Sequence, residues 1–407
     1  MQKLPLSAVV AGLIAVLVSY SGPFVVVLAA ARAAGLSEAQ TTSWVWAISI
    51  GSGLTCLVLS VLTKQPVITA WSTPGAALLV GSLGAYHYSD AIGAFLFAAL
   101  GMTIIGLSGL FGRMLAKVPT GIISAMLAGI LLPFALGAFQ ALPKAPAIVL
   151  AVLVAYFIGR RLLARYAVLL ALLAGTVVAA LSHDLHLGGA RFAVAVPHLT
   201  VPTWDLSALV GIGLPLLVVT MASQNAPGLA VLRASGYTPN DRLLLTGTGL
   251  ASVLLAPFGS HGINLAAITA AICTGEESHP NPRKRWVAGA ACGVFYLICG
   301  LLGTGLVQFF TALPKPLVAV VAGVALFGAL LGGLAGALDD VPAREGALVT
   351  LAATASGMTV AGIGSAFWGL IGGVGVHLVL TLWRRRPPAT PSPAVEPAPA
   401  QEPVGSR

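Results

Sequence analysis

One stretch of the sequence reads Gln65-Pro66-Val67-Ile68-Thr69-Ala70-Trp71-Ser72-Thr73-Pro74-Gly75-Ala76-Ala77-Leu78-Leu79, and a second reads Ala256-Pro257-Phe258-Gly259-Ser260-His261-Gly262-Ile263-Asn264-Leu265-Ala266-Ala267-Ile268-Thr269. Both are too polar, and too often interrupted by Gly and Pro, to be ordinary membrane helices. They nevertheless occupy corresponding places in the two halves of a very apolar chain. In secondary transporters, paired broken segments of this kind point to the place where the substrate binds. The two stretches therefore predict a transport site.

The composition around these stretches predicts a helical protein that crosses a membrane many times. Of 407 residues, 57% are hydrophobic and only 8% are charged, so uncharged runs of membrane-spanning length follow one another. These runs lack the alternation of a β-barrel strand, and helices satisfy their own backbone hydrogen bonds within a bilayer. We therefore expect an all-α polytopic fold in a lipid bilayer, with residues 4–31 as a first span instead of a cleaved signal.

The distribution of Lys and Arg predicts how many times the chain crosses. Division of the chain at its charged and Gly- or Pro-rich joints gives fourteen crossings. With the N-terminus inside, seventeen of the 21 Lys and Arg lie on the inner side, and only Arg32, Lys144, Arg191 and Lys315 lie outside. This positive-inside bias supports the count and predicts that both termini are cytoplasmic. It also accounts for the net charge of +9 without a nucleic-acid partner.

Fourteen crossings divide into seven and seven, and an odd number per half means that the second half enters the membrane from the opposite face. Weak traces of such an inverted repeat remain in the sequence. Residues 19–25 and residues 223–229 each combine polar side chains with a mid-helix Pro. These traces lie in register with the two broken segments, which become the third and the tenth crossing.

Each broken segment is predicted to be a short strand followed by a half-helix. In the third crossing, residues 67–71 are rich in β-branched and aromatic side chains, and Ser72 or Thr73 can cap the helix that follows. In the tenth crossing, residues 258–262 are the irregular part and residues 264–272 the helical part. Because the halves are inverted, both half-helices would begin at the bilayer midplane.

Two helix N-termini that converge form an anion site without any Lys or Arg, because each carries unpaired amides and roughly +0.5 of an elementary charge. No Lys or Arg is predicted at the midplane. The alternative is that Gly and Pro merely kink two helices whose capping groups satisfy one another. Non-helical backbone argues against this alternative, since at membrane depth it is tolerated only where it is buried in protein or lines a cavity.

Polar and aromatic side chains of the interrupted crossings are the candidate substrate-binding residues. They are Tyr20, Ser21, Phe24, Trp71, Ser72, Thr73, Gly75, Gln224, Asn225, Ser260, His261, Gly262 and Asn264. The amides of Gln224 and Asn225 can donate to a carboxylate, or can bond carbonyls that Pro227 frees. The aromatic side chains can stack on a substrate ring, or can simply pack.

His261 is the candidate for proton coupling. Among the seven His residues it alone is predicted at the midplane beside the anion site, and an imidazole gains and loses a proton near neutral pH. The alternative is a neutral His261 that is hydrogen-bonded to backbone groups at the break.

Four runs together resemble the bacterial benzoate membrane transport family. They are Ser-Gly-Pro at 21–23, the stretch 66–75, Ser-Gln-Asn-Ala-Pro at 223–227 and Asn-Leu-Ala-Ala-Ile-Thr-Ala-Ala-Ile-Cys at 264–273, and the resemblance covers about residues 5–383. It implies uptake of benzoate with protons across the bacterial inner membrane. It also implies the seven-plus-seven inverted-repeat fold shared with uracil permeases and sulfate-type anion transporters.

That fold implies a core domain that moves against a gate domain, and it permits a homodimer through the gate domain. The implied boundaries are 1–112 (core, crossings one to four), 113–205 (gate, five to seven), 206–310 (core, eight to eleven), 311–383 (gate, twelve to fourteen) and 384–407 (a disordered cytoplasmic tail).

One departure from the wider fold is informative. The nucleobase relatives carry carboxylates in crossings eight and ten, where this chain has Gln224, Asn225, His261 and Asn264. An acid would repel a carboxylate substrate, which is ionised at neutral pH. The replacement therefore suits an aromatic acid better than a nucleobase.

The nearest rival function is import of another small organic or inorganic anion on the same fold, and an anion channel is a further rival. An enzyme is not expected, because the chain lacks His-Glu-x-x-His and Gly-x-Ser-x-Gly motifs and paired intramembrane carboxylates. Cys56, Cys273, Cys292 and Cys299 lie in apolar segments without metal-ligand spacing. We therefore expect free thiols, no bound metal and no cofactor.

Overall fold

The computed structural model describes residues 5–112, 119–185, 193–361 and 363–382, and within these it is mostly helical. The predicted tail at 384–407, the predicted boundary at 113 and Arg191 lie outside the described residues. The helices are α1 (Leu6–Ser21), α2 (Pro23–Ala33), α3 (Glu38–Thr63), α4 (Thr73–Ser82), α5 (Tyr88–Ser108), α7 (Thr120–Gln140), α8 (Pro146–Leu162), α9 (Ala167–Leu181), α10 (Leu206–Ala208), α11 (Leu214–Thr220), α12 (Ala226–Ala234), α13 (Asp241–Leu255), α14 (Ile268–Thr274), α15 (Trp286–Leu301), α16 (Gly303–Thr311), α17 (Lys315–Asp339), α18 (Arg344–Ala355) and α19 (Ser365–Leu382). The strands are β1 (Thr69–Trp71), β2 (Ile263–Leu265), β3 (Thr359–Val360) and β4 (Ile363–Gly364), which pair as β1–β2 and β3–β4.

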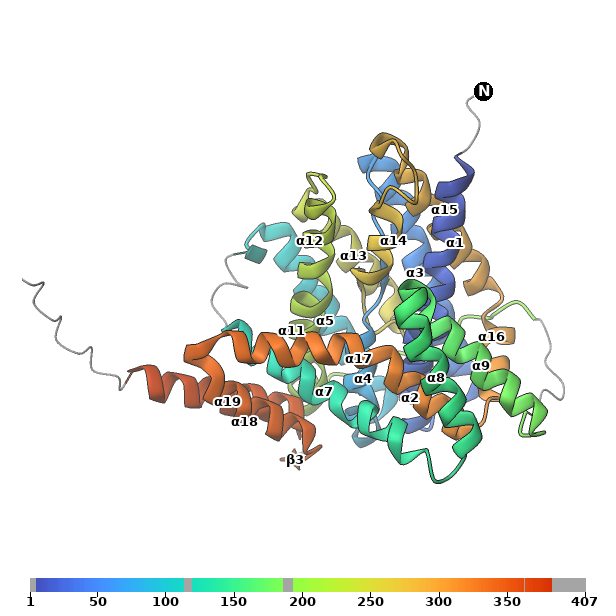
Figure 1. The fold of residues 1–407 in the computed structure, drawn as a ribbon. Coiled ribbons are helices and arrows are strands. Elements are labelled where there is room, and N and C mark those ends of the chain that lie inside the picture. The colour runs from blue at the N-terminus through green and yellow to red at the C-terminus, as the bar shows by residue number, and fades with distance from the viewer. Residues whose placement is uncertain (1–4, 113–118, 186–192, 362, 383–407) are drawn as a thin grey trace, which may run out of the picture.

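The helices form two groups that lie against each other (Figure 1). In one group α3 packs on α15, α5 on α13, and α1 on α15. In the other α7 packs on α17 and α18, α18 on α19, and α8 on α9. In Figure 1 the first group stands steeply, whereas α7, α17, α18 and α19 lie across the view beneath it. The first group comes from the segments expected in the core domain, and the second from those expected in the gate domain.

The length and apolarity of the helices make this a polytopic membrane protein. Among the described residues, seven helical stretches are long and apolar enough to cross a membrane, and they include α3, α5, α7 and α17. Three shorter apolar helical stretches, Thr73–Ala85, Ala167–Leu181 and Ser365–Thr381, add to them. Large apolar side chains such as Leu107 and Leu181 are exposed on the outside of the bundle, where lipid would cover them.

The helices that lead to the candidate site are interrupted as the sequence predicts. Gly22 separates α1 from α2, and Pro23 opens the second helix at a position that needs no backbone donor. In the second half, π-helical turns at Leu209–Gly213 and Met221–Asn225 interrupt the path from α10 to α12. Such π-turns release backbone carbonyls and often mark functional sites.

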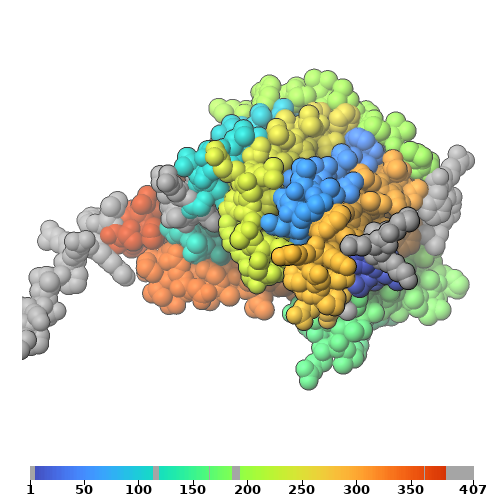
Figure 2. Space-filling model, turned by 90° about the horizontal axis from the view of Figure 1, so that it is seen from above, coloured from blue at the N-terminus to red at the C-terminus, as the bar shows by residue number. Residues whose placement is uncertain are grey.

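Connections that are far apart in sequence meet at one end of the steep group. The Gln65 side-chain amide donates to the Thr238 carbonyl at 3.2 Å, and the Tyr237 hydroxyl donates to the Pro282 carbonyl at 3.0 Å. Figure 2 shows this end from above, with the segment that follows α3 between the α12–α13 turn and the segment that precedes α15. These connections therefore lie on the same side of the protein.

Candidate substrate site at the two broken segments

The two broken segments are joined by a short antiparallel ladder. β1 and β2 pair with Trp71 opposite Ile263, and the Ser72 N–H donates to the Gly262 carbonyl at 3.3 Å. Gly262 has a φ of 145°, a conformation that favours glycine. Because the strands are antiparallel, α4 and α14 leave the ladder from opposite ends. The ladder satisfies the non-helical backbone of both segments inside the protein.

The second half-helix begins later than its sequence predicts. Helix was expected over residues 264–272, but residues 263–265 form β2 and α14 runs from Ile268 to Thr274. Asn225 supplies the physical reason, since its side-chain oxygen accepts the Leu265 N–H at 2.9 Å and holds β2 extended. The Asn225 amide was expected to bond carbonyls freed by Pro227 or to contact a substrate, but here its oxygen accepts an N–H of the other broken segment and its NH2 group donates to the sulfur atoms of Met102 and Met221. Contact with a substrate stays a prediction.

His261 links the two broken segments through both of its ring nitrogens. The indole N–H of Trp44 donates to Nδ1 of His261 at 2.9 Å, and Nε2 lies 2.9 Å from the Ser72 carbonyl oxygen. An indole N–H can only donate and a carbonyl can only accept, so the ring is neutral with its proton on Nε2. The side chain is almost completely buried. This geometry supports the bracing role that the sequence left open beside proton transfer.

The first turn of α4 is largely satisfied by Ser72. Its hydroxyl accepts the Gly75 N–H at 3.1 Å and a bond from Thr220 Oγ1 at 3.0 Å, while its carbonyl accepts the Ala76 N–H at 2.8 Å. The intervening proline has no N–H. The Thr73 amide is then the one donor of this turn without a partner among the described residues. The half-buried Thr73 side chain lies beside it.

Gly75 allows the close packing of α4 at this point. A Cβ on Gly75 would lie 2.6 Å from a methyl group of Leu216 and 2.8 Å from the Ser72 hydroxyl oxygen. Any larger side chain would therefore displace the Ser72 cap. Gly75 shapes the site without contributing a binding group.

Aromatic side chains surround the end of β1. The ring centroid of Trp71 lies 5.4 Å from that of Tyr20, 6.2 Å from that of Phe24 and 5.9 Å from that of Tyr296. These distances are those of favourable edge-to-face pairs. The Tyr20 hydroxyl is satisfied by Ser49 at 2.5 Å. The structure thus brings together three of the predicted aromatic residues in an apolar cluster beside α4.

Trp71 carries the most informative polar atom of this cluster. Its side chain is 1% exposed, and its indole N–H has no hydrogen-bond partner among the described residues. A buried donor without an acceptor costs free energy comparable to a lost hydrogen bond. An anionic ligand beside β1 would remove that cost.

The other predicted residues have mixed surroundings. Asn264 is buried, and with its amide oxygen turned toward β1 it accepts the Ser72 N–H at 2.9 Å. The Ser21 hydroxyl donates to the Val18 carbonyl within its own helix at 2.8 Å. The Ser260 hydroxyl is buried without a partner among the described residues. Gln224 is half-buried on a π-turn and remains a candidate contact.

Sequence reasoning missed three side chains that hold this region. Trp44 orients His261, Tyr296 completes the aromatic cluster, and Thr220 supports the Ser72 cap. Trp44 and Tyr296 lie within apolar helices that carry no break, and Thr220 is the last residue of α11, directly before a π-turn. Their pattern in sequence is that of ordinary core residues.

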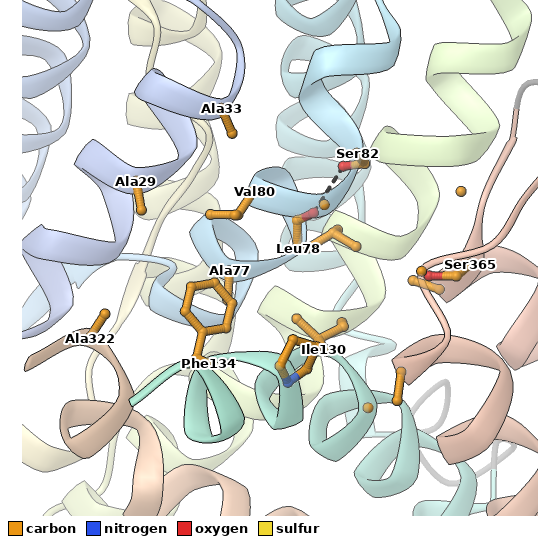
Figure 3. Close-up of a pocket in the computed structure, with 18 of the residues that line it drawn as sticks. Ala29, Ala33, Ala77, Leu78, Val80, Ser82, Ile130, Phe134, Ala322 and Ser365 are labelled. Atoms are coloured by element: carbon orange, nitrogen blue, oxygen red, sulfur yellow. Dashed lines mark hydrogen bonds between the residues drawn. The ribbon is translucent and has the colours of Figure 1, made fainter. Parts of the chain in front are cut away.

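The candidate site is closed in this conformation. The cavity beside His261 and Gly262 holds only about 10 Å³, which is at most the room of one water. A much larger cavity of about 580 Å³ lies between the two helix groups, and none of the thirteen predicted site residues lines it (Figure 3).

Comparisons with known proteins place the chain in a family. The family model described as "Benzoate membrane transport protein" matches residues 2–379. The chain is 39% identical over 379 residues to the benzoate membrane transport protein of Acinetobacter baylyi, covering 93% of this chain and 96% of the relative. It is also 39% identical over 380 residues to the inner membrane protein YdcO of Escherichia coli, covering 93% and 97%.

Solved structures share the fold at much lower identity. The transmembrane domain of the cyanobacterial bicarbonate transporter BicA gives a TM-score of 0.54 at 17% identity, covering 94% of this chain and 98% of that one. The murine Slc26a9 anion transporter gives a TM-score of 0.59 at 13% identity, covering 94% and 69%. These structures show the fold that the chain shares. The family match over nearly the whole chain and the 39% identical benzoate membrane transport protein show that this protein is a membrane transporter, not an enzyme, and that it belongs to the benzoate membrane transport protein family.

Proposed function

We propose that this transporter imports benzoate, or a similar small aromatic carboxylate, together with protons by alternating access. The observation that carries the proposal is the buried, unpartnered indole N–H of Trp71 within an aromatic cluster. An aromatic ring fits against Tyr20 and Phe24, and a carboxylate can accept from Trp71 and from the free Thr73 amide at the start of α4. The carboxylate of the substrate thereby satisfies donors that the protein leaves unpaired.

The charge distribution around the cluster agrees with an anionic substrate. No Asp or Glu is buried among the described residues, so no acid opposes a carboxylate there. Arg285 is the one buried Lys or Arg among the described residues. Its guanidinium donates to backbone carbonyls, including that of Thr274 at 2.7 Å. Neutral donors, which are backbone and indole N–H groups together with the Ser260 hydroxyl and the Gln224 amide, are therefore the groups that remain for the anion.

Contacts between distant connections support fourteen crossings in a seven-plus-seven arrangement. The Lys64 ammonium lies 4.3 Å from the Trp286 ring centroid, so both sit on one face and an even number of crossings separates them. Only three of the seven long helical stretches lie between them, which is an odd number and would put them on opposite faces. The Arg32 guanidinium likewise bonds the Phe310 carbonyl at 3.2 Å across five such stretches. Shorter helices must supply further crossings, and the fourteen-crossing scheme gives eight and ten.

The two helix groups support the proposed domains. We assign the steep group to a core domain (1–112 and 206–310) and the other to a gate domain (113–205 and 311–383), with both termini in the cytoplasm. Movement of the core against the gate would open the candidate site to each side in turn. The bacterial inner membrane is the expected location, because a 39% identical relative is named an inner membrane protein.

The test is uptake of labelled benzoate into proteoliposomes under an imposed inward proton gradient. We expect accumulation that saturates and that collapses when the gradient is dissipated. Substituted benzoates should inhibit this accumulation more strongly than uracil or sulfate does. Protein-free liposomes control for passive entry of the neutral acid. Accumulation no greater than in these liposomes would contradict the proposal, and non-saturating flux without accumulation would indicate a channel.

A further inference from the structure

The cavity of about 580 Å³ lies between helices of both proposed domains. One wall comes from α2 and α4. The opposite wall comes from α7, α17, the end of α18 and the start of α19. Figure 3 shows Leu78, Ile130 and Phe134 around its middle, Ala29 toward one end and Ser365 toward the other. The cavity is mostly apolar and is separate from the candidate substrate site.

Two cations line one end of this cavity. Arg32 belongs to the last turn of α2, and Lys315 is the first residue of α17. The Arg32 guanidinium donates to the Phe310 carbonyl just before α17, which places both cations at the same end. Both side chains are exposed, and no Asp or Glu is among the residues that line the cavity. This end therefore suits an anionic group beside an apolar body.

The size of the cavity exceeds what a single-ring acid can fill. Cavities of about 300–1,000 Å³ hold drug-sized ligands and bury most of their surface. A benzoate held by Arg32 and Lys315 at one end would leave most of the 580 Å³ open, and Ile130 and Phe134 lie around the middle of the cavity. A carboxylate with a longer aromatic body reaches from the cations to these side chains.

We propose that this cavity binds aromatic carboxylates of two or more rings, with the carboxylate at Arg32 and Lys315 and the rings against Leu78, Ile130 and Phe134. Such a ligand contacts α2 and α4 as well as α7 and α17, so it opposes relative movement of the two helix groups. It therefore inhibits transport without occupying the site at β1. The inhibition rests on the proposed domain movement, whereas the binding does not.

The test is calorimetric titration of biphenylcarboxylate into the purified protein in lipid nanodiscs. We expect saturable binding of the acid. The uncharged biphenylcarboxamide should bind more weakly by about tenfold or more, because the amide lacks the charge that the two cations recognise. An Arg32→Gln, Lys315→Gln double variant should lose a similar factor. Lys144→Gln removes an exposed cation that does not line the cavity, and should bind as the wild type does.

A second variant fills the cavity without changing its charge. Ala319→Phe should abolish binding of biphenylcarboxylate, and its thermal unfolding midpoint reports whether it is folded. Equal binding of the acid and the amide by the wild type would overturn the proposal. So would complete displacement by benzoate together with unchanged binding in the double variant. Retained binding in a protein that fails to accumulate benzoate would count against the transport proposal alone.

Discussion

Trp71 offers a donor that can be removed while its ring is largely kept. In a Trp71→Phe variant we expect the KM for benzoate to rise by roughly tenfold or more, because a hydrogen bond to a charged acceptor contributes about 1.5–3 kcal/mol. The measurement is the concentration dependence of labelled uptake in proteoliposomes. Trp204→Phe, at an exposed site, is the matched control and should leave KM unchanged. A lower maximal rate at unchanged KM would instead assign Trp71 to packing.

His261 can be tested for a bracing role against a proton-carrying role. Acceptance of a proton at Nδ1 would break its bond from Trp44, so we expect His261→Ala and His261→Gln to keep the pH dependence of uptake. His261→Ala should also destabilise the protein by about 1–3 kcal/mol, because the Trp44 N–H and the Ser72 carbonyl lose a partner. Uptake over a pH series and thermal unfolding are the two measurements.

The control for His261 is His87→Ala, an exposed imidazole that should change neither quantity. Loss of proton-driven accumulation in both His261 variants, while downhill uptake of benzoate persists, would show that His261 carries the proton after all.

Single residues were predictable where a local pattern marks them. Ser72 or Thr73 was expected as the cap of this half-helix, and Ser72 caps α4, because capping depends on neighbours a few residues away. Trp44 and Tyr296 were not predictable as parts of the site. They reach it only because α3 and α15 pack together, and that contact joins segments far apart in sequence.

Gly22 sits where the first broken helix meets the other helix group. A Cβ on Gly22 would lie 2.5 Å from the Ala325 Cβ of α17 and 2.6 Å from a Val168 methyl of α9, although its φ of −132° is open to any residue. We therefore expect Gly22→Val to push the two groups apart and to lower the rate of uptake by about tenfold or more. Initial rates at saturating benzoate provide the measurement.

A compensating change separates this contact from general damage. Gly22→Ala should lower the rate less than Gly22→Val, and Ala325→Gly in the same chain should restore part of it. Gly328→Ala is the control. Gly328 lies on α17 like Ala325, a Cβ there would meet open space, and the variant should leave the rate unchanged. No slowing in Gly22→Val would mean that α1 and α17 need not slide closely past each other.

Among the elements, the third crossing followed its sequence more closely than the tenth. A strand before a half-helix was expected at residues 67–71, and β1 ends at Trp71 with α4 beginning at Thr73. In the tenth crossing the run that begins at Asn264 has good helix formers, but its first residues pair with β1. Tertiary pairing overrides local propensity there, and a single sequence does not contain the register of that pair.

At the scale of the whole molecule, the number of crossings decides which connections face the cytoplasm. With the N-terminus inside, fourteen crossings put residue 144 outside and residue 283 inside, whereas the seven long helical stretches alone would reverse both. Residue 37 follows the first crossing and is outside in either scheme. It therefore reports the orientation of the chain independently of the count.

Single cysteines at these three positions test the topology directly. Cys56, Cys273 and Cys292 are buried and Cys299 is half-buried, so the wild-type chain should react little with a membrane-impermeant maleimide. On intact cells we expect Ser37→Cys and Lys144→Cys to be labelled, and Arg283→Cys only after permeabilisation. Labelling of Ser37→Cys and Arg283→Cys without Lys144→Cys would reject fourteen crossings, and labelling of Arg283→Cys alone would invert the chain. The expected pattern, with Ser37→Cys and Lys144→Cys labelled, also fits the contact between Lys64 and Trp286, which requires an even number of crossings between them.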